Sequence, residues 1–166
     1  MISTEHARLM ARYNQWQNGS LYVAADTLPD AERRRERGAF FGSIHGTLSH
    51  LLWGDRMWMS RFTGNEKREA TIKDSPALFT DWDDLKQKRA AFDQTIVDWA
   101  DKLDPSWLYG NLTWVSGAAK REVVKPQWFL LTHFFNHQTH HRGQAHAMLT
   151  AAGAKPDDTD LMLMKM

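Results

Sequence analysis

Four long stretches of this chain repeat their apolar side chains at helical spacing, and this pattern limits the fold more than any other feature. The first predicted helix carries Leu9 and Leu21 on its apolar face. The four predicted helices run from Thr4 to Asp26, from Gly38 to Phe62, from Asp81 to just before Asp104, and from Pro126 to Gly153. Helices of this length with short connections are typical of an all-α antiparallel four-helix bundle.

The segment before the last predicted helix has a different pattern. Aromatic and β-branched residues occupy 107–115 and 121–124, on either side of the turn-forming pair Ser116-Gly117. Such a pattern predicts a small β-hairpin, which must lie on the helices because a lone hairpin is marginally stable. The charged stretch from Lys67 to Ser75 is predicted to be a loop. Without a repeat, low-complexity tract or linker, residues 1–166 are predicted to form a single domain.

The charge balance and the lack of cysteine exclude several classes of protein. The 21 basic and 20 acidic residues are well mixed and give a net charge of +1, which argues against binding to nucleic acid or to membranes. The only basic cluster, Arg33 to Arg37, is predicted to be a solvated loop or the start of a helix. Without cysteine there are neither disulfides nor thiolate metal sites. Since no signal peptide or membrane-spanning stretch is evident, we expect a cytoplasmic protein.

The last predicted helix carries four histidines on one face. His133, His137, His140 and His141 fall within about 100° of one another when each residue turns the helix by 100°. His137 and His141 are four residues apart, a spacing at which two imidazoles can hold one metal ion. The alternative is a surface helix with incidental histidines. We favour a metal, because the same face is apolar and unpaired polar groups are costly there.

A further ligand should come from a facing helix, and the second predicted helix offers His45 and His50. Gly46 and Gly54 lie on the face of His50 and would leave space for a metal, water and substrate. We therefore expect His50 to be the ligand and His45 to be a structural or surface histidine. The alternative for His50 is a core histidine that is hydrogen-bonded to a neighbouring helix. The fallback ligand set is His133, His137 and His45.

Four segments together resemble the DinB-like family of metal-binding helical bundles, a damage-inducible family related to the YfiT-type metal-dependent hydrolases. They are residues 13–18 (YNQWQN), 43–55 (SIHGTLSHLLWGD), 136–144 (NHQTHHRGQ) and 156–161 (PDDTDL). The resemblance covers nearly the whole chain, and its most specific part is the element His-x-x-x-His-Arg-Gly-Gln. It implies that His50, His137 and His141 bind one divalent metal ion. Zinc or nickel would suit three imidazole nitrogens.

The same resemblance implies two reactions without choosing between them. Relatives in the wider superfamily transfer low-molecular-weight thiols or isomerise substrates with a thiol cofactor, and a metal that lowers the pKa of water would allow hydrolysis. We therefore expect a metal-dependent hydrolase or thiol transferase that acts on a small molecule. The alternative is a non-catalytic stress-response bundle with a structural metal site.

Residues that bind substrate or move protons are harder to assign. Gln144 shares the ligand face and is expected to contact a ligand or substrate, while Trp53 and Trp16 are expected to line a cleft or, alternatively, to pack in the core. No general base is evident: Asp55 points about 140° away from His50 on a helix. The sequence does not place Glu122 or Asp101 relative to the site.

A second set of apolar stripes predicts a homodimer. Helices that are apolar all round must be buried on every side, which a four-helix bundle achieves only in part. The hairpin or the C-terminal tail could cover these stripes instead. The stripes consist of Trp128, Leu131, Phe135, Ala145 and Leu149 on the last helix, and of Phe41, Ile44, Leu48, Leu52 and Met59 opposite His50.

Overall fold

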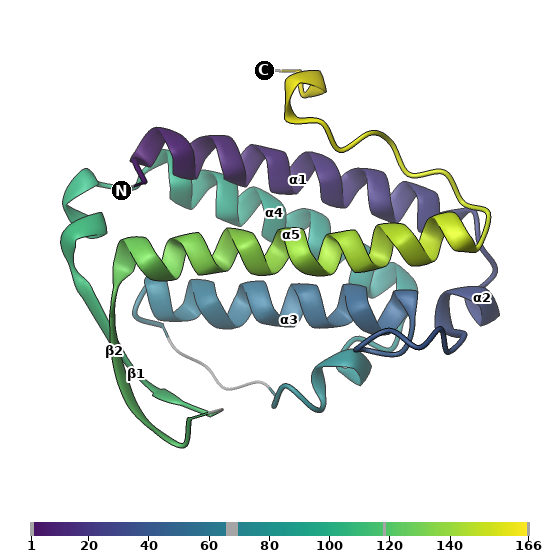
Figure 1. The fold of residues 1–166 in the computed structure, drawn as a ribbon, viewed down its shortest axis with the longest axis horizontal. Coiled ribbons are helices and arrows are strands. Elements are labelled where there is room, and N and C mark those ends of the chain that lie inside the picture. The colour runs from purple at the N-terminus through teal and green to yellow at the C-terminus, as the bar shows by residue number, and fades with distance from the viewer. Residues whose placement is uncertain (1, 66–69, 118, 166) are drawn as a thin grey trace.

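The computed structural model describes residues 2–65, 70–117 and 119–165, and these are mostly helical (Figure 1). The long helices are α1 (Thr4–Asp26), α3 (Ile44–Phe62), α4 (Trp82–Asp101) and α5 (Gln127–Ala151). A short helix α2 (Asp30–Arg34) and three 3-10 turns, η1 (Ser75–Ala77), η2 (Pro105–Tyr109) and η3 (Leu161–Leu163), lie between or after them. None of the described helices has the length and apolar character needed to cross a lipid bilayer.

The predicted hairpin is confirmed as a two-stranded antiparallel sheet. Strand β1 (Asn111–Ser116) pairs with β2 (Arg121–Pro126), and Trp114 lies opposite Val123. The sheet lies beside the start of α5 (Figure 1), and the Trp114 ring packs on Trp58 of α3, with ring centroids 5.7 Å apart. The hairpin is therefore supported by the helices, as an isolated two-stranded sheet requires.

The long helices pack along one another, but not all neighbours are antiparallel. Helix α1 packs against α4 and α5, and α3 packs against α5 and α4. In Figure 1, α1 and α5 run in one direction while α3 and α4 run in the other, so the pairs α1–α5 and α3–α4 are parallel. The prediction of short connections was wrong between α3 and α4. The 19 residues between Phe62 and Trp82 are long enough to run back along α3, which also has 19 residues, so that α4 starts near the same end as α3.

Helix α3 begins later than predicted, at Ile44 and not at Gly38. Gly38 and Gly42 have φ values of 70° and 75°, which a right-handed helix does not use. Ser43 has an extended backbone and its side chain accepts a hydrogen bond from the Gly46 amide, so it caps the helix. Residues 38–43 instead form a tight turn.

The predicted loop before η1 and the basic cluster from Arg33 to Arg37 agree with the structure only in part. In the predicted loop between Lys67 and Ser75, residues 67–69 lie outside the described residues, and 70–74 contain neither helix nor strand before η1 begins at Ser75. The basic cluster is only partly solvated, because Arg33 is buried. Its guanidinium lies 4.6 Å from the centroid of the Trp82 ring and donates to the Leu28 carbonyl.

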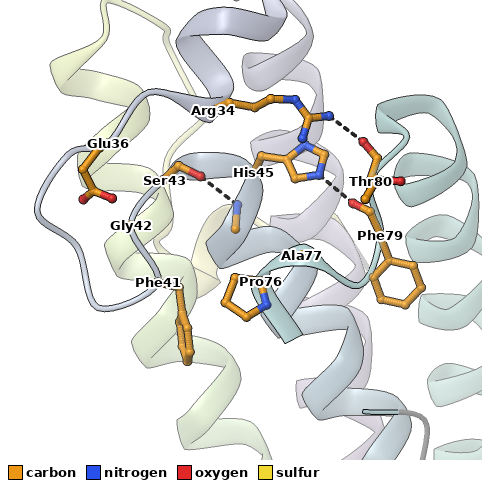
Figure 2. A pocket seen from close by; sticks show the side chains of 11 residues that line it. Arg34, Glu36, Phe41, Gly42, Ser43, His45, Pro76, Ala77, Phe79 and Thr80 are labelled. Atoms are coloured by element: carbon orange, nitrogen blue, oxygen red, sulfur yellow. Dashed lines mark hydrogen bonds between the residues drawn. The ribbon is translucent and has the colours of Figure 1, made fainter. Parts of the chain in front are cut away.

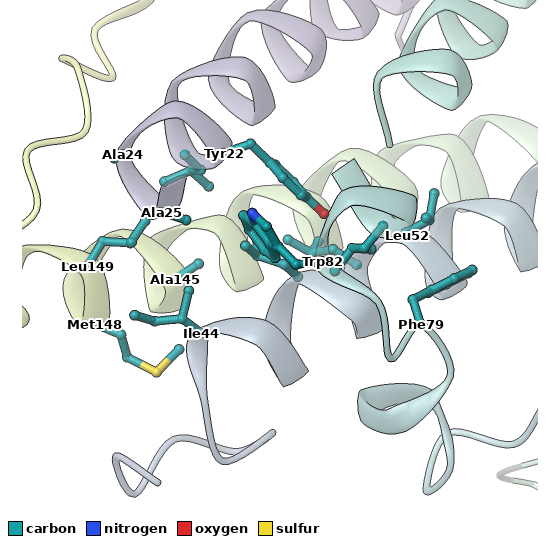
Figure 3. Packing of buried hydrophobic residues seen from close by; sticks show 14 of the residues in the cluster. Tyr22, Ala24, Ala25, Ile44, Leu52, Phe79, Trp82, Ala145, Met148 and Leu149 are labelled. Carbon is teal, nitrogen blue, oxygen red and sulfur yellow. The ribbon is translucent and has the colours of Figure 1, made fainter. Parts of the chain in front are cut away.

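The apolar core has two parts, one at each end of the long helices. The part nearer the start of α3, shown in Figure 3, includes Ile44, Leu52 and Leu149 together with the stacked rings of Tyr22 and Trp82. The other part includes Phe62, Phe134, Ile96 and Leu131. These side chains are buried within the chain and account for the folding of all four long helices.

A layer of buried polar side chains lies near the middle of the four long helices. Arg89 of α4 is 2% exposed and lies 2.7 Å from both Asp55 of α3 and Asp93 of its own helix. Burial raises the pKa of Asp93 to about 6, although Arg89 opposes this effect. Asn14 and Asn18 of α1 donate to Asp93, Gln138 of α5 donates to Asp55, and Arg142 of α5 donates to Asn14.

Candidate metal centre

Helices α3 and α5 bring His50, His137 and His141 together. Each histidine offers one ring nitrogen, and the three nitrogens all lie within 4.8 Å of one another. A separation of more than about 8 Å would exclude a shared ion even after rearrangement of the side chains. Nε2 of His50 and Nε2 of His137 are 3.2 Å apart. Two nitrogens bound to one tetrahedral zinc ion at 2.0–2.1 Å would be about 3.3 Å apart. The spacing of this pair therefore fits coordination of a single ion.

The hydrogen bonds of Ser75 fix the tautomer of His50. The Ser75 hydroxyl donates to the Ile72 carbonyl at 2.7 Å, so its oxygen accepts from Nδ1 of His50 at 2.8 Å. The proton of this imidazole is therefore on Nδ1, and the lone pair is on Nε2, which faces His137. Such a hydrogen bond to the distal ring nitrogen is typical of histidines that bind metals.

Gln144 fixes the tautomer of His141 in the same way. Its side-chain carbonyl accepts from Nδ1 of His141 at 2.7 Å, and its amide nitrogen lies 3.2 Å from Nε2 of the exposed His140. An amide oxygen can only accept, so Nε2 of His141 keeps its lone pair. Gln144 therefore orients an imidazole, and contact of this residue with a substrate remains a prediction.

Burial keeps these imidazoles neutral. Burial, followed by the neighbouring imidazoles, lowers the pKa of both His50 and His137 to about 3. Burial also lowers the pKa of His141, although its bond to Gln144 opposes this effect. At neutral pH all three rings are uncharged, which is the form that binds a metal ion. The donor set therefore suits a divalent cation.

Gly54 allows His137 to lie close to α3. A Cβ atom at position 54 would be 2.9 Å from Cε1 of His137, closer than such atoms normally approach. The prediction that Gly54 clears space at the site is consistent with this geometry, although the space holds an imidazole. Nδ1 of His137 is buried and has no hydrogen-bond partner among the described residues.

Two aromatic rings cover His50. Phe41 stacks on it with ring centroids 3.7 Å apart and lies 5.2 Å from His141, and Trp53 lies 5.4 Å from His50. The expectation that Phe41 lies opposite His50 was wrong, because residue 41 precedes α3. Gly42 and the capping Ser43 were the sequence features that could have indicated a helix start after Phe41. Trp53 is buried and donates to the Ala70 carbonyl at 3.2 Å.

Other residues considered from the sequence lie away from the three imidazoles or have another partner. Trp16 is half-buried on α1, with its ring centroid 5.9 Å from that of Tyr13. His45 is buried, and its Nε2 donates to the Phe79 carbonyl at 2.6 Å, so the structural role expected for it fits its contacts. His133 is exposed and packs against Trp58, with centroids 5.1 Å apart.

The three carboxylates considered as a general base have other positions. Asp55 faces the interior and pairs with Arg89. Asp101 forms an ion pair with Arg12 at 2.9 Å, and Glu122 is exposed on β2. Asp55 thus points away from His50, as expected from its position on the helix.

The chain is similar to known proteins along its whole length. The model of the DinB family matches residues 1–166. The chain belongs to the DinB family. Protein DinB of Bacillus subtilis (strain 168) is 27% identical to this DinB-family chain over 169 residues, which are 95% of this chain and 92% of that protein. The resemblance found from the sequence motifs is therefore confirmed.

Proposed function

We propose that His50, His137 and His141 bind one divalent metal ion, zinc or nickel, in a three-histidine site. The observation that carries this proposal is the convergence of three neutral imidazoles within 4.8 Å. The hydrogen bonds that Ser75 and Gln144 accept from Nδ1 of His50 and His141 support it, because they leave lone pairs on the ring nitrogens that face the cluster.

We further propose that the site is catalytic and acts on a small molecule as a hydrolase or low-molecular-weight thiol transferase. Three protein ligands are typical of catalytic zinc sites, which keep a further position for water or substrate. When bound, the metal would supply a Lewis acid that lowers the pKa of water or of a thiol. The three uncharged imidazoles would not neutralise a divalent ion, so the site would favour anionic groups. Ser75 and Gln144 would hold the ligands in position.

A non-catalytic role is the second candidate, and one observation favours it. Phe41 stacks on His50, and both His50 and His141 are buried. If this ring stays in place, the metal would have a structural or sensing role in a stress-response protein. A coordination position on the metal that binds and releases added small ligands would instead support the catalytic role.

The experiment that tests the metal site is elemental analysis of purified protein after metal removal and reloading. We expect one ion per chain in the wild type, and a loss of that ion in His50→Ala, His137→Ala and His141→Ala. His133→Ala is the matched control, since it also changes a histidine of α5 and should keep the ion. Loss of metal in His133→Ala with retention in His141→Ala would favour the fallback set. Ester-hydrolysis and thiol-transfer screens on the loaded protein then test catalysis.

The wider arrangement is also a proposal. We propose that the four long helices form a four-helix bundle in a single domain, which the packing of α1 on α4 and α5 and of α3 on α4 and α5 supports. The cytoplasmic location remains a prediction.

The homodimer likewise remains a prediction. The apolar residues on which it was based are mostly covered within the chain, so they do not require a partner. Light scattering at micromolar concentration would decide between monomer and dimer. The buried members of the two stripes are Leu131, Phe135, Ala145 and Leu149 of α5 and Ile44, Leu48, Leu52 and Met59 of α3.

A further inference from the structure

A cavity of about 290 Å³ lies at the start of α3 (Figure 2). Its walls include the apolar side chains of Phe41, Pro76 and Phe79, and Arg34 and Glu36 also line it. Ligand pockets have volumes of about 300–1,000 Å³, so this cavity would suit a small molecule.

The cavity and the histidine cluster share a wall. Phe41 lines the cavity and stacks on His50. Gly46 also lines the cavity, and it precedes His50 by four residues, which is about 6 Å along the axis of a helix and nearly the same face. A Cβ atom at Gly46 would lie 2.5 Å from the Phe41 carbonyl oxygen, so glycine is needed for the turn to hold Phe41 here. Phe41 therefore contacts both the cavity and His50.

Arg34 is the cation of this cavity. Its Nε donates to Asp30 at 2.7 Å and its Nη2 donates to the Thr80 carbonyl at 2.5 Å (Figure 2 shows the second bond). A guanidinium has five N–H groups, so these two bonds leave donors for a carboxylate. Asp30 fixes the guanidinium in place but neutralises part of its charge.

Glu36 lies apart from Arg34 in the view of Figure 2. One of its carboxylate oxygens accepts from the Gly38 amide at 2.8 Å, and it forms no ion pair among the described residues. A ligand whose carboxylate binds Arg34 could place an apolar chain against Phe41 and Pro76. Any group of the ligand close to Glu36 would have to be a hydrogen-bond donor, because a carboxylate only accepts.

We propose that this cavity binds a small carboxylate with a short apolar chain, and that Phe41 is the movable wall between this ligand and the metal centre. The inference rests on the proposed function, since the ligand would be the substrate of that centre. Arg34 binds the carboxylate, the apolar walls bind the chain, and rotation of the Phe41 ring away from His50 lets the reacting end approach. Phe41 is thus a positioning residue.

Hexanoate is a suitable probe, with 1-hexanol as the uncharged control of the same chain length. In ¹H–¹⁵N spectra of the metal-free protein, hexanoate should shift the amide signals of Gly42, Gly46 and Thr80 and bind more tightly than 1-hexanol. Arg34→Gln should weaken hexanoate binding by about tenfold or more, because a hydrogen bond to a charged group is lost. Arg35→Gln is the matched control. Arg35 is an exposed neighbour that pairs with Glu32, and its replacement should leave binding unchanged.

A second measurement tests the link to the metal. In cobalt-loaded protein, 6-mercaptohexanoate, whose thiol lies at the end away from the carboxylate, should change the visible spectrum. Arg34→Gln should raise the concentration needed for this change, and Phe41→Leu should lower it. Equal binding of hexanoate and 1-hexanol, or equal affinity in Arg34→Gln and wild type, would overturn the carboxylate site. Binding in the cavity without any spectral change would overturn its link to the metal centre. Failure of cobalt to bind would refute the proposed function but leave the measurement on metal-free protein valid.

Discussion

Replacement of Gly54 by alanine should weaken metal binding without unfolding the protein. The new methyl carbon would be 2.9 Å from Cε1 of His137, whereas ordinary contacts begin at 3.4 Å, so the imidazole must move by about 0.5 Å. Metal–ligand distances tolerate only about 0.2 Å. The ring therefore cannot both avoid the methyl group and keep its position relative to His50.

The size of the effect follows from comparable changes around metal ligands. Disturbing the groups that orient a ligand lowers metal affinity by about tenfold to a hundredfold, and we expect a loss in this range. The stability of the metal-free protein should change little. Alanine is about 1 kcal/mol more favourable than glycine inside a helix, and this gain offsets part of the cost of moving His137.

The assay is competitive titration of zinc into metal-free protein, together with thermal unfolding. Gly19→Ala is the matched control, because Gly19 lies within α1 and a Cβ atom there would have no neighbour within 4 Å. The control should gain up to about 1 kcal/mol of stability and bind zinc like the wild type. If Gly54→Ala binds zinc as tightly as Gly19→Ala, then His137 is not held against α3 as a ligand.

Three other predictions concern the hydrogen bonds and charges around the site. Ser75→Ala removes the acceptor for Nδ1 of His50, so zinc affinity should fall about tenfold to a hundredfold; an unchanged titration would contradict this role. In the presence of a chelator, the free energy of unfolding should fall as the pH is lowered from 7.5 to 6. His50 and His137, with pKa values of about 3, stay neutral in the folded chain, whereas the same histidines in the unfolded chain take up protons near pH 6.5. Below about pH 6 Asp93 takes up a proton in the folded chain, and this offsets part of the loss. Urea midpoints that stay constant from pH 7.5 to 6 would refute the conclusion that His50 and His137 are neutral in the folded chain. Arg89→Met leaves two buried carboxylates without their cation and should cost about 3–5 kcal/mol in urea unfolding, whereas a loss below about 1 kcal/mol would show that water reaches the layer.

Local sequence patterns were enough to predict the helices and the pairing of two histidines. The apolar spacing and the Pro29 turn gave the bounds of α1 as the structure has them, from Thr4 to Asp26. The four-residue spacing of His137 and His141 put both rings on one face, because helical geometry depends only on positions along the chain. His50 could be matched to them because the glycines beside it marked a face with free space.

Contacts between distant segments could not be read from the same patterns. Phe41 was assigned to a helix by its spacing, although the positive φ values of Gly38 and Gly42 exclude a helix there and place its ring on His50. Ser75 lies 25 residues from His50 in the sequence, so no periodicity relates the two. Arg89 would be expected at the surface by its charge, and only the packing of other helices shows that it is buried.

The three-histidine metal site is tested most directly by anomalous diffraction from crystals of the metal-loaded protein, with data collected on both sides of the absorption edge of the loaded metal, zinc or nickel. We expect one anomalous peak per chain, about 2.0–2.1 Å from ring nitrogens of His50, His137 and His141, with at least one position filled by water or a small ligand. A peak at another set of residues, or none at full metal loading, would contradict the three-histidine site. A metal whose positions are all filled by the protein would contradict the catalytic role.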